Sequence, residues 1–142
     1  MDNLKFMLRA LEVSKKALPL CLPNPPVGCV LVKAGDIIAE GFTQSIGGHH
    51  AEVQAFNQYA GSLEYVTAYV TLEPCAFEGR TPSGAKMIAS TNIFKVVVAM
   101  QDNDIRNNGK GIQLLRDNGI DVDVGIGRDQ VNEFIKQYLG KS

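Results

Sequence analysis

The stretches that organise this chain are His49-His50-Ala51-Glu52-Val53 and Thr71-Leu72-Glu73-Pro74-Cys75. Each stretch stands between a segment typical of a β-strand and a segment typical of an α-helix, which is the alternation of an α/β fold. Imidazole, thiolate and carboxylate groups are also the usual ligands and proton carriers of a catalytic metal site. We therefore expect the two stretches to meet at one place in the folded chain.

The hydrophobic pattern predicts the remaining elements of the fold. Apolar residues at helical spacing predict an opening helix that runs to about residue 17 and a closing helix near residues 131–139. Strands are expected at residues 27–33, 37–41, 65–72, 95–100 and 120–124, and helices are expected to follow residues 50, 84 and 109. In the helix that follows residue 50, the apolar positions are Val53, Phe56 and Ala60. This order predicts an α/β fold with a five-stranded mixed sheet and helices on both faces.

Composition limits the class of protein. The chain has 142 residues, 45% of them hydrophobic, which predicts a single domain over residues 1–142. The chain has fourteen Lys and Arg residues and fifteen Asp and Glu residues, so it has no excess of positive charge that would favour a nucleic-acid partner. No signal peptide or long apolar run is present, so we expect a cytoplasmic protein with no membrane partner. The three cysteines are an odd number and are expected to be thiols.

The two central stretches suggest zinc chemistry. Zinc held by imidazole and thiolate groups keeps one position for water and lowers the pKa of that water. A carboxylate that is not a ligand then moves the proton. In this interpretation His50 and Cys75 are ligands and Glu52 is the catalytic proton carrier. Taken singly, a His-x-Glu pair is usually a solvated helix start and a Pro-Cys pair a buried strand end, but their combination favours the metal site.

One expected ligand is missing from the pattern. The zinc deaminase signature is H-x-E followed by P-C-x-x-C, and the position of its last cysteine is held here by Glu78. Zinc accepts carboxylate oxygen, so Glu78 is a candidate third ligand. His49 and Cys29 are weaker candidates. A further alternative is that the site binds zinc poorly and that the protein has left catalysis.

Five segments together resemble a known family. They are Asn-Pro-Pro-Val-Gly-Cys-Val-Leu-Val at 24–32, His-Ala-Glu-Val at 50–53, Tyr-Val-Thr-Leu-Glu-Pro-Cys at 69–75, Gly-Arg-Thr-Pro at 79–82 and Val-Val-Ala-Met-Gln-Asp at 97–102. This set is similar to the deaminase domain of the bifunctional riboflavin-biosynthesis deaminase/reductase. The resemblance implies a cytidine deaminase-like three-layer α/β/α sandwich, a zinc ion and hydrolytic deamination of a diaminopyrimidinone ribosyl phosphate. We expect no reductase domain within residues 1–142.

The resemblance also implies substrate-binding residues and shows where this chain departs from the family. The implied substrate-binding positions are Asn24, Thr43, Ala51, Phe77 and Arg80. Members of the family usually have histidines at the positions of Thr43 and Phe77, and they have the last cysteine ligand at the position of Gly84. These departures imply a degenerate zinc site and a changed pocket.

Two functional hypotheses follow from these observations. In the first, the chain is a zinc-dependent hydrolase that removes an amine from an aminopyrimidine nucleotide or a related small heterocycle. The substrate that the resemblance implies carries a ribosyl phosphate. In the second, it is a metal-poor homologue that acts as a binding module or as a partner in an oligomer. The resemblance also implies a homo-oligomer. A nucleic-acid deaminase is disfavoured by the balanced charge.

Overall fold

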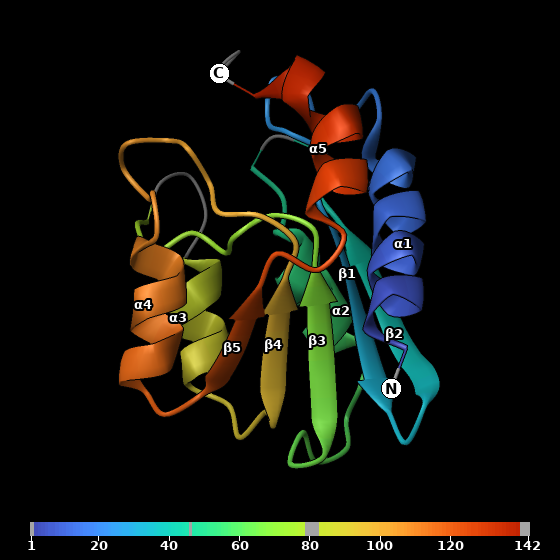
Figure 1. Ribbon diagram of the computed structural model, residues 1–142, viewed down its shortest axis with the longest axis vertical. Helices are drawn as coiled ribbons and strands as arrows, with labels where there is room; N and C mark the ends of the chain where they lie inside the picture. Colours follow the sequence, from blue (N-terminus) through green and yellow to red (C-terminus); the bar gives the residue numbers. More distant parts are fainter. Residues whose placement is uncertain (1, 46, 79–82, 140–142) are drawn as a thin grey trace.

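The computed structural model describes residues 2–45, 47–78 and 83–139. Five strands form one sheet in the order β2-β1-β3-β4-β5 (Figure 1). Their bounds are β1 (Gly28–Lys33), β2 (Asp36–Phe42), β3 (Val66–Val70), β4 (Lys95–Val98) and β5 (Asp121–Val124). Strand β1 pairs antiparallel with both β2 and β3, whereas β3, β4 and β5 are parallel. The predicted five-stranded mixed sheet is therefore confirmed.

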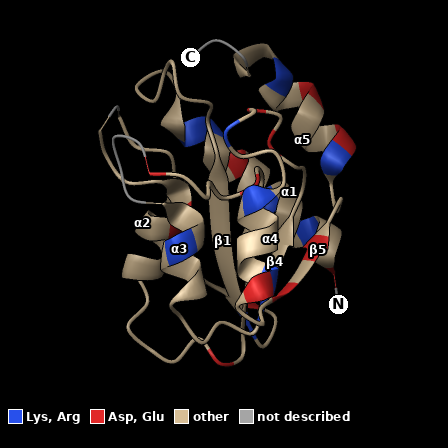
Figure 2. Cartoon of the chain, turned by 90° about the vertical axis from the view of Figure 1, so that its left-hand side faces the viewer, with Lys and Arg blue, Asp and Glu red and all other residues tan. Residues whose placement is uncertain are grey.

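Helices cover both faces of the sheet and complete a three-layer sandwich. Helices α1 (Asn3–Ser14) and α5 (Arg128–Ile135) pack on one face, and each continues into a 3-10 turn, η1 (Lys15–Ala17) and η2 (Lys136–Tyr138). The other face carries α2 (Ala51–Asn57), α3 (Gly84–Ala89) and α4 (Lys110–Asp117). Figure 2 shows α2 and α3 on one side of β1 and α5 on the other. None of the helices in the described part of the chain has the length and hydropathy of a membrane span.

The two cores follow from the alternation of side chains along the strands. In β4, Val96 and Val98 pack towards α2, α3 and α4, while Val97 packs towards α1 and α5. In β1, Leu31 belongs to the first of these cores and Val30 to the second. Because successive side chains of a strand point to opposite faces, a run that is apolar at every position is buried on both. This confirms the interpretation of the valine run as a central parallel strand.

The buried face of α2 differs from the sequence prediction. Phe56 is buried as expected, but Val53 is only half-buried, and Ala60 is exposed and lies beyond the end of the helix. The helix instead buries Glu52 and Ala55. Carboxylates are usually exposed, so a prediction from hydrophobic residues alone assigns Glu52 to the solvent-facing side of the helix. The predicted buried face was therefore turned away from Glu52. The difference matters because it turns Glu52 towards the interior.

Candidate active site

The carboxyl ends of β3 and β4 lie at the upper end of the sheet in Figure 1. A cavity opens where they meet the start of α2. Its volume is about 790 Å³. Eight of the residues proposed from the sequence line it, namely Asn24, Thr43, His49, His50, Ala51, Glu52, Cys75 and Phe77. Ligand sites of α/β sheets are commonly found at the carboxyl ends of the strands, so the position suits a binding or active site.

His50 and Cys75 come together inside this cavity. His50 is the N-cap residue of α2, Cys75 follows β3, and the Nε2 atom of His50 lies 3.5 Å from the Sγ atom of Cys75. Zinc binds imidazole nitrogen at about 2.0–2.1 Å and thiolate sulfur at about 2.3 Å, so two such ligands of a tetrahedral ion lie about 3.5 Å apart. The pair therefore fits one edge of a tetrahedral zinc site.

Glu52 lies in the first turn of α2, two residues after His50. Its side chain is only 4% exposed. Burial raises the pKa of the Glu52 carboxyl, and the neighbouring His50 opposes this effect. A carboxyl whose pKa is raised towards neutrality can both accept and release a proton during a reaction. The structure therefore places a candidate proton carrier in the wall of the same cavity.

Gly84, the first residue of α3, lies between Cys75 and Glu52. Burial raises the pKa of the Cys75 thiol, and a hydrogen bond with the backbone of Gly84 partly offsets this. A Cβ atom at position 84 would lie 2.9 Å from Oε2 of Glu52. A side chain at this position would therefore enter the site, whereas glycine contributes no metal ligand.

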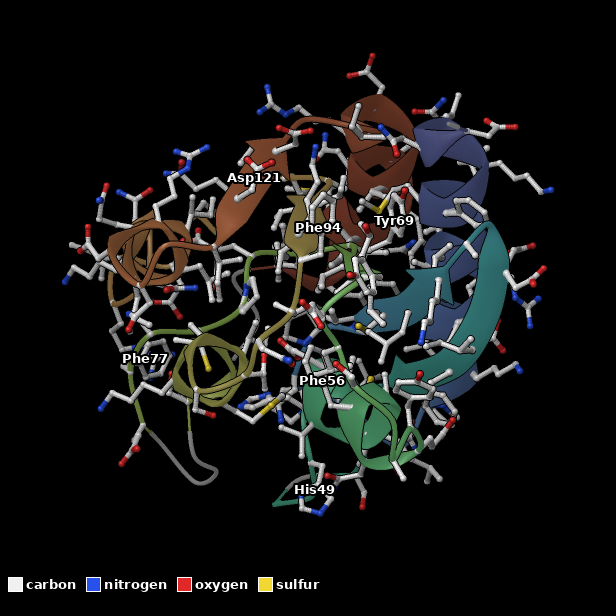
Figure 3. All side chains as sticks on the ribbon, turned by 90° about the horizontal axis from the view of Figure 1, so that it is seen from below. His49, Phe56, Tyr69, Phe77, Phe94 and Asp121 are labelled. Carbon is white, nitrogen blue, oxygen red and sulfur yellow. The ribbon has the colours of Figure 1, made fainter. Side chains whose placement is uncertain are left out.

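The other candidate third ligands lie elsewhere. The Glu78 side chain is 59% exposed, and its carboxylate lies 3.9 Å from Nζ of Lys86. It points to solvent, so the structure does not bring it to the pair formed by His50 and Cys75. Cys29 is buried in the core of the sheet, whereas His49 lines the cavity but is exposed, and Figure 3 shows it at the periphery of the molecule. Among residues 2–45, 47–78 and 83–139, no group of three His, Cys, Asp or Glu side chains is arranged to hold a metal ion.

The implied substrate-binding residues have different surroundings. Asn24 is exposed at the rim of the cavity, and Arg80 lies outside the described residues. The Thr43 side chain is buried, and its Oγ1 accepts a hydrogen bond from the backbone N–H of Val27 at 2.9 Å. The same oxygen lies 3.3 Å from the carbonyl oxygen of Pro25, to which it donates. Thr43 therefore holds the backbone beside Asn24 in addition to lining the cavity.

A guanidinium group that the sequence analysis missed lies beside Phe77. The Nε and Nη2 atoms of Arg106 donate to the two carboxylate oxygens of Asp104 at 3.1 and 2.7 Å. The central guanidinium carbon lies 4.5 Å from the centroid of the Phe77 ring. All three residues line the cavity. The sequence did contain a signal for this group, because Asp104 and Arg106 follow the buried parallel strand β4. Residues at such positions lie at the carboxyl edge of the sheet, where ligands commonly bind.

The loop that carries Arg106 is tied to the segment before Cys75. Glu73 is buried, and its Oε1 accepts hydrogen bonds from the backbone N–H groups of Asp102 at 2.9 Å and Gly109 at 3.0 Å. Its Oε2 accepts a third bond from the N–H of Ile112 at 3.0 Å. A carboxylate at the first turn of a helix is favoured by the helix dipole, and here it satisfies N–H groups at the start of α4.

Comparison with known proteins agrees with this geometry. The family defined by the cytidine and deoxycytidylate deaminase zinc-binding region matches residues 1–100. The chain belongs to this deaminase family. The matched region contains His50, Glu52 and Cys75, the three residues that meet in the cavity. The cytidine deaminase-like fold expected from the sequence is thereby confirmed.

Similar proteins come from riboflavin biosynthesis. The riboflavin biosynthesis protein RibD of Haemophilus influenzae is 45% identical over 134 residues, which are 94% of this chain and 36% of RibD. The solved structure of Acinetobacter baumannii RibD, form 2, has a TM-score of 0.91 at 43% identity and covers 97% of this chain and 39% of that chain. A Thermotoga maritima diaminohydroxyphosphoribosylaminopyrimidine deaminase/reductase has a TM-score of 0.88 at 39% identity, covering 96% and 40%. This deaminase-family chain thus spans somewhat more than a third of these relatives.

Proposed function

We propose that this chain is a zinc-type hydrolytic deaminase of an aminopyrimidine nucleotide or a related heterocycle. The observation that carries the proposal is the 3.5 Å approach of His50 Nε2 to Cys75 Sγ beside the buried carboxyl of Glu52. The relatives support the substrate class, since one of them is titled a diaminohydroxyphosphoribosylaminopyrimidine deaminase. The sequence identity over nearly the whole chain supports a shared chemistry.

His50 and Cys75 are the proposed zinc ligands. When bound, zinc acts as a Lewis acid and lowers the pKa of water towards neutrality. A structural zinc site with a full set of protein ligands supplies about 10–16 kcal/mol, and removing one ligand lowers that figure by several kcal/mol. Because Gly84 supplies no donor, we expect weaker zinc binding here than in a three-ligand deaminase. The affinity should still exceed that of a chain without Cys75.

Glu52 is the proposed proton carrier. Its carboxyl accepts one proton of the attacking water and delivers it to the ring nitrogen. It then takes the remaining proton from the hydroxyl group of the adduct to the departing amine, which leaves as ammonia while the carbonyl forms. The raised pKa that follows from burial suits both steps, since the group must be able to hold the proton between them. The cavity walls at Phe77 and Asn24 would orient the heterocycle against this carboxyl.

The test is ammonia release from a panel of aminopyrimidine nucleotides, nucleosides and pterins, with and without added zinc. Glu52→Gln keeps the shape of the side chain and removes its proton transfer, so the rate on every active compound should fall about 10²–10⁴-fold. Glu78→Gln is the matched control at an exposed site and should leave the rate unchanged. Equal rates for the wild type and Glu52→Gln would contradict the mechanism. Binding of these compounds without ammonia release would favour the binding-module hypothesis.

The prediction of a homo-oligomer is part of this proposal. Several large apolar side chains are exposed on the single chain, among them Leu20, Tyr65, Phe94 and Ile105. Contacts between subunits would remove such side chains from water. Sedimentation velocity at several protein concentrations measures the state, and a monomer at every concentration would contradict this part of the proposal.

A further inference from the structure

The side chain of Asn107 joins two segments of the site without lining the cavity. It is 0% exposed and lies between β4 and α4. Its Oδ1 accepts hydrogen bonds from the backbone N–H groups of Ala76 at 3.1 Å and Gly111 at 3.2 Å. Its Nδ2 donates to the carbonyl oxygen of Pro74 at 3.2 Å. Asn107 therefore binds the residue before Cys75 and the residue after it.

The segment that contains Cys75 is packed closely on the start of α4. A Cβ atom at Gly111 would lie 1.8 Å from the carbonyl oxygen of Pro74, so only glycine permits this approach. Glu73 accepts hydrogen bonds from the N–H groups of Gly109 and Ile112 in the same region. The contact leaves Asn107 with no polar atom unsatisfied among the described residues. Such a buried and fully bonded amide fixes the backbone more strongly than an exposed one.

The two sides of Cys75 are thus held by different helices. Its carbonyl oxygen accepts a hydrogen bond from Ser83 Oγ at 2.6 Å and another from the N–H of Ala85 at 3.0 Å, both at the start of α3. Asn107 supplies the corresponding bonds from the α4 side. The positions of the backbone before and after Cys75 determine where its Sγ atom lies. A zinc ligand must be placed within about 0.2 Å of its bonding distance, so this fixation bears directly on metal affinity.

We infer that Asn107 is a positioning residue that places Cys75 Sγ opposite His50. The inference rests on the proposed function for the role of Cys75 as a zinc ligand, although the hydrogen bonds do not depend on it. Residues that orient a metal ligand from outside the coordination sphere commonly change metal affinity about 10- to 100-fold when they are replaced. Asn107 does not line the cavity, and its hydrogen bonds reach the backbone of Pro74 and Ala76, so it acts through the backbone of residues 74–76.

The first measurement is zinc affinity by competition with a chromophoric chelator, at a temperature at which every variant is folded. Asn107→Ala removes all bonds of the amide and should lower the affinity about 10- to 100-fold. Asn107→Asp keeps the acceptor for Ala76 but places a buried oxygen against the carbonyl oxygen of Pro74 and the Asp102 carboxylate, to which Nδ2 donates at 3.4 Å, so its loss should be at least as large. Thr71→Val is the matched control, because Thr71 is also buried and accepts a bond from the Gly28 N–H at 3.1 Å. Thr71→Val should lower the stability of the fold but leave the zinc affinity within about twofold of the wild-type value.

The second measurement uses zinc-free protein, so that it does not depend on the metal. Cys21 and Cys29 are buried and Cys75 is partly exposed, so iodoacetamide should alkylate Cys75 first. Loss of the Asn107 bonds should raise this rate at least fivefold over that of Thr71→Val. If Asn107→Ala and Thr71→Val agree in both measurements, the positioning role is overturned. If wild type and Cys75→Ser bind zinc equally, the proposed zinc site fails, and the alkylation rates alone decide the role of Asn107.

Discussion

The Nε2 atom of His50 and the Sγ atom of Cys75 lie 3.5 Å apart, although one residue starts a helix and the other follows a strand. Strand β1 pairs with β2 on one side and β3 on the other, which brings the segments after β2 and β3 to the same end of the sheet. The distance equals that between two ligands of one tetrahedral zinc ion, about 3.5 Å. The fold therefore places the two side chains as one edge of such a site would require.

Gly84→Cys should complete the metal site. A Cβ atom there would lie 2.9 Å from Oε2 of Glu52, which is the end of a flexible side chain and can move aside. The new thiolate would then face the pair formed by His50 and Cys75, and chelator competition should show at least a hundredfold gain in zinc affinity, about 3 kcal/mol. Gly84→Ala adds the same Cβ without sulfur and serves as the control. An equal affinity for both variants would show that position 84 does not face the metal.

Arg106→Ala should raise the pKa of Asp104. The hydrogen bonds from Arg106 lower the pKa of this carboxyl to about 2. Because the pKa in the folded state is depressed, the ionised carboxyl stabilises the fold above about pH 4, and this stabilisation is lost as the pH falls towards 2. In the variant the backbone N–H of residue 106 still donates to Asp104, so a carboxyl NMR titration should place the pKa above about 2 but below the ordinary value of about 3.9. Arg128→Ala, on α5, should leave it unchanged, and a pKa near 2 in Arg106→Ala would refute the pairing.

Phe77→Leu should weaken substrate binding more than turnover. The variant keeps an apolar side chain but removes the ring on which the Arg106 guanidinium lies. Because Phe77 lines the cavity but has no group that moves a proton, KM should rise about two- to fivefold while kcat changes less than twofold. Phe94→Leu changes an exposed aromatic residue outside the cavity lining and is the control. A large fall in kcat with constant KM would instead assign Phe77 to the chemical step.

Gly111→Ala should destabilise the fold at the start of α4. The added Cβ would lie 1.8 Å from the carbonyl oxygen of Pro74, which is a backbone atom and cannot move without shifting the segment before Cys75. Such overpacking costs about 1–3 kcal/mol or more, measured by urea unfolding. Lys110→Ala, at the exposed preceding residue, should change stability by less than about 0.5 kcal/mol. Wild-type stability in Gly111→Ala would mean that α4 does not approach Pro74 so closely.

The pattern of the sequence predicted the architecture because burial on one or both faces leaves a periodic signal. The run Val96 to Val98 marked a strand covered on both sides, and the structure places it in the middle of the parallel part of the sheet. Element ends were less accurate. Tyr65 was included in the third strand, yet it is exposed and precedes β3, because an aromatic residue favours strands regardless of its burial.

The site was predictable only where a motif carried it. His50, Glu52 and Cys75 were named from their residue types and spacing, and the cavity contains all three. Asn107 had no such signal, since a hydrogen bond between segments distant in the chain depends on tertiary packing and has no period. Arg106 had only the weaker signal of a charged pair after a buried strand. Glu78 was proposed from spacing alone, and the structure turns it to solvent. Spacing along a loop does not determine the direction of a side chain.

The most direct test of the zinc-type deaminase proposal is anomalous scattering at the zinc edge from crystals grown with zinc. We expect a single strong peak in the cavity, about 2.0–2.1 Å from Nε2 of His50 and about 2.3 Å from Sγ of Cys75. The peak should disappear in Cys75→Ser crystals prepared in the same way. A wild-type map without a peak between these two atoms, or with the metal bound elsewhere on the chain, would contradict it.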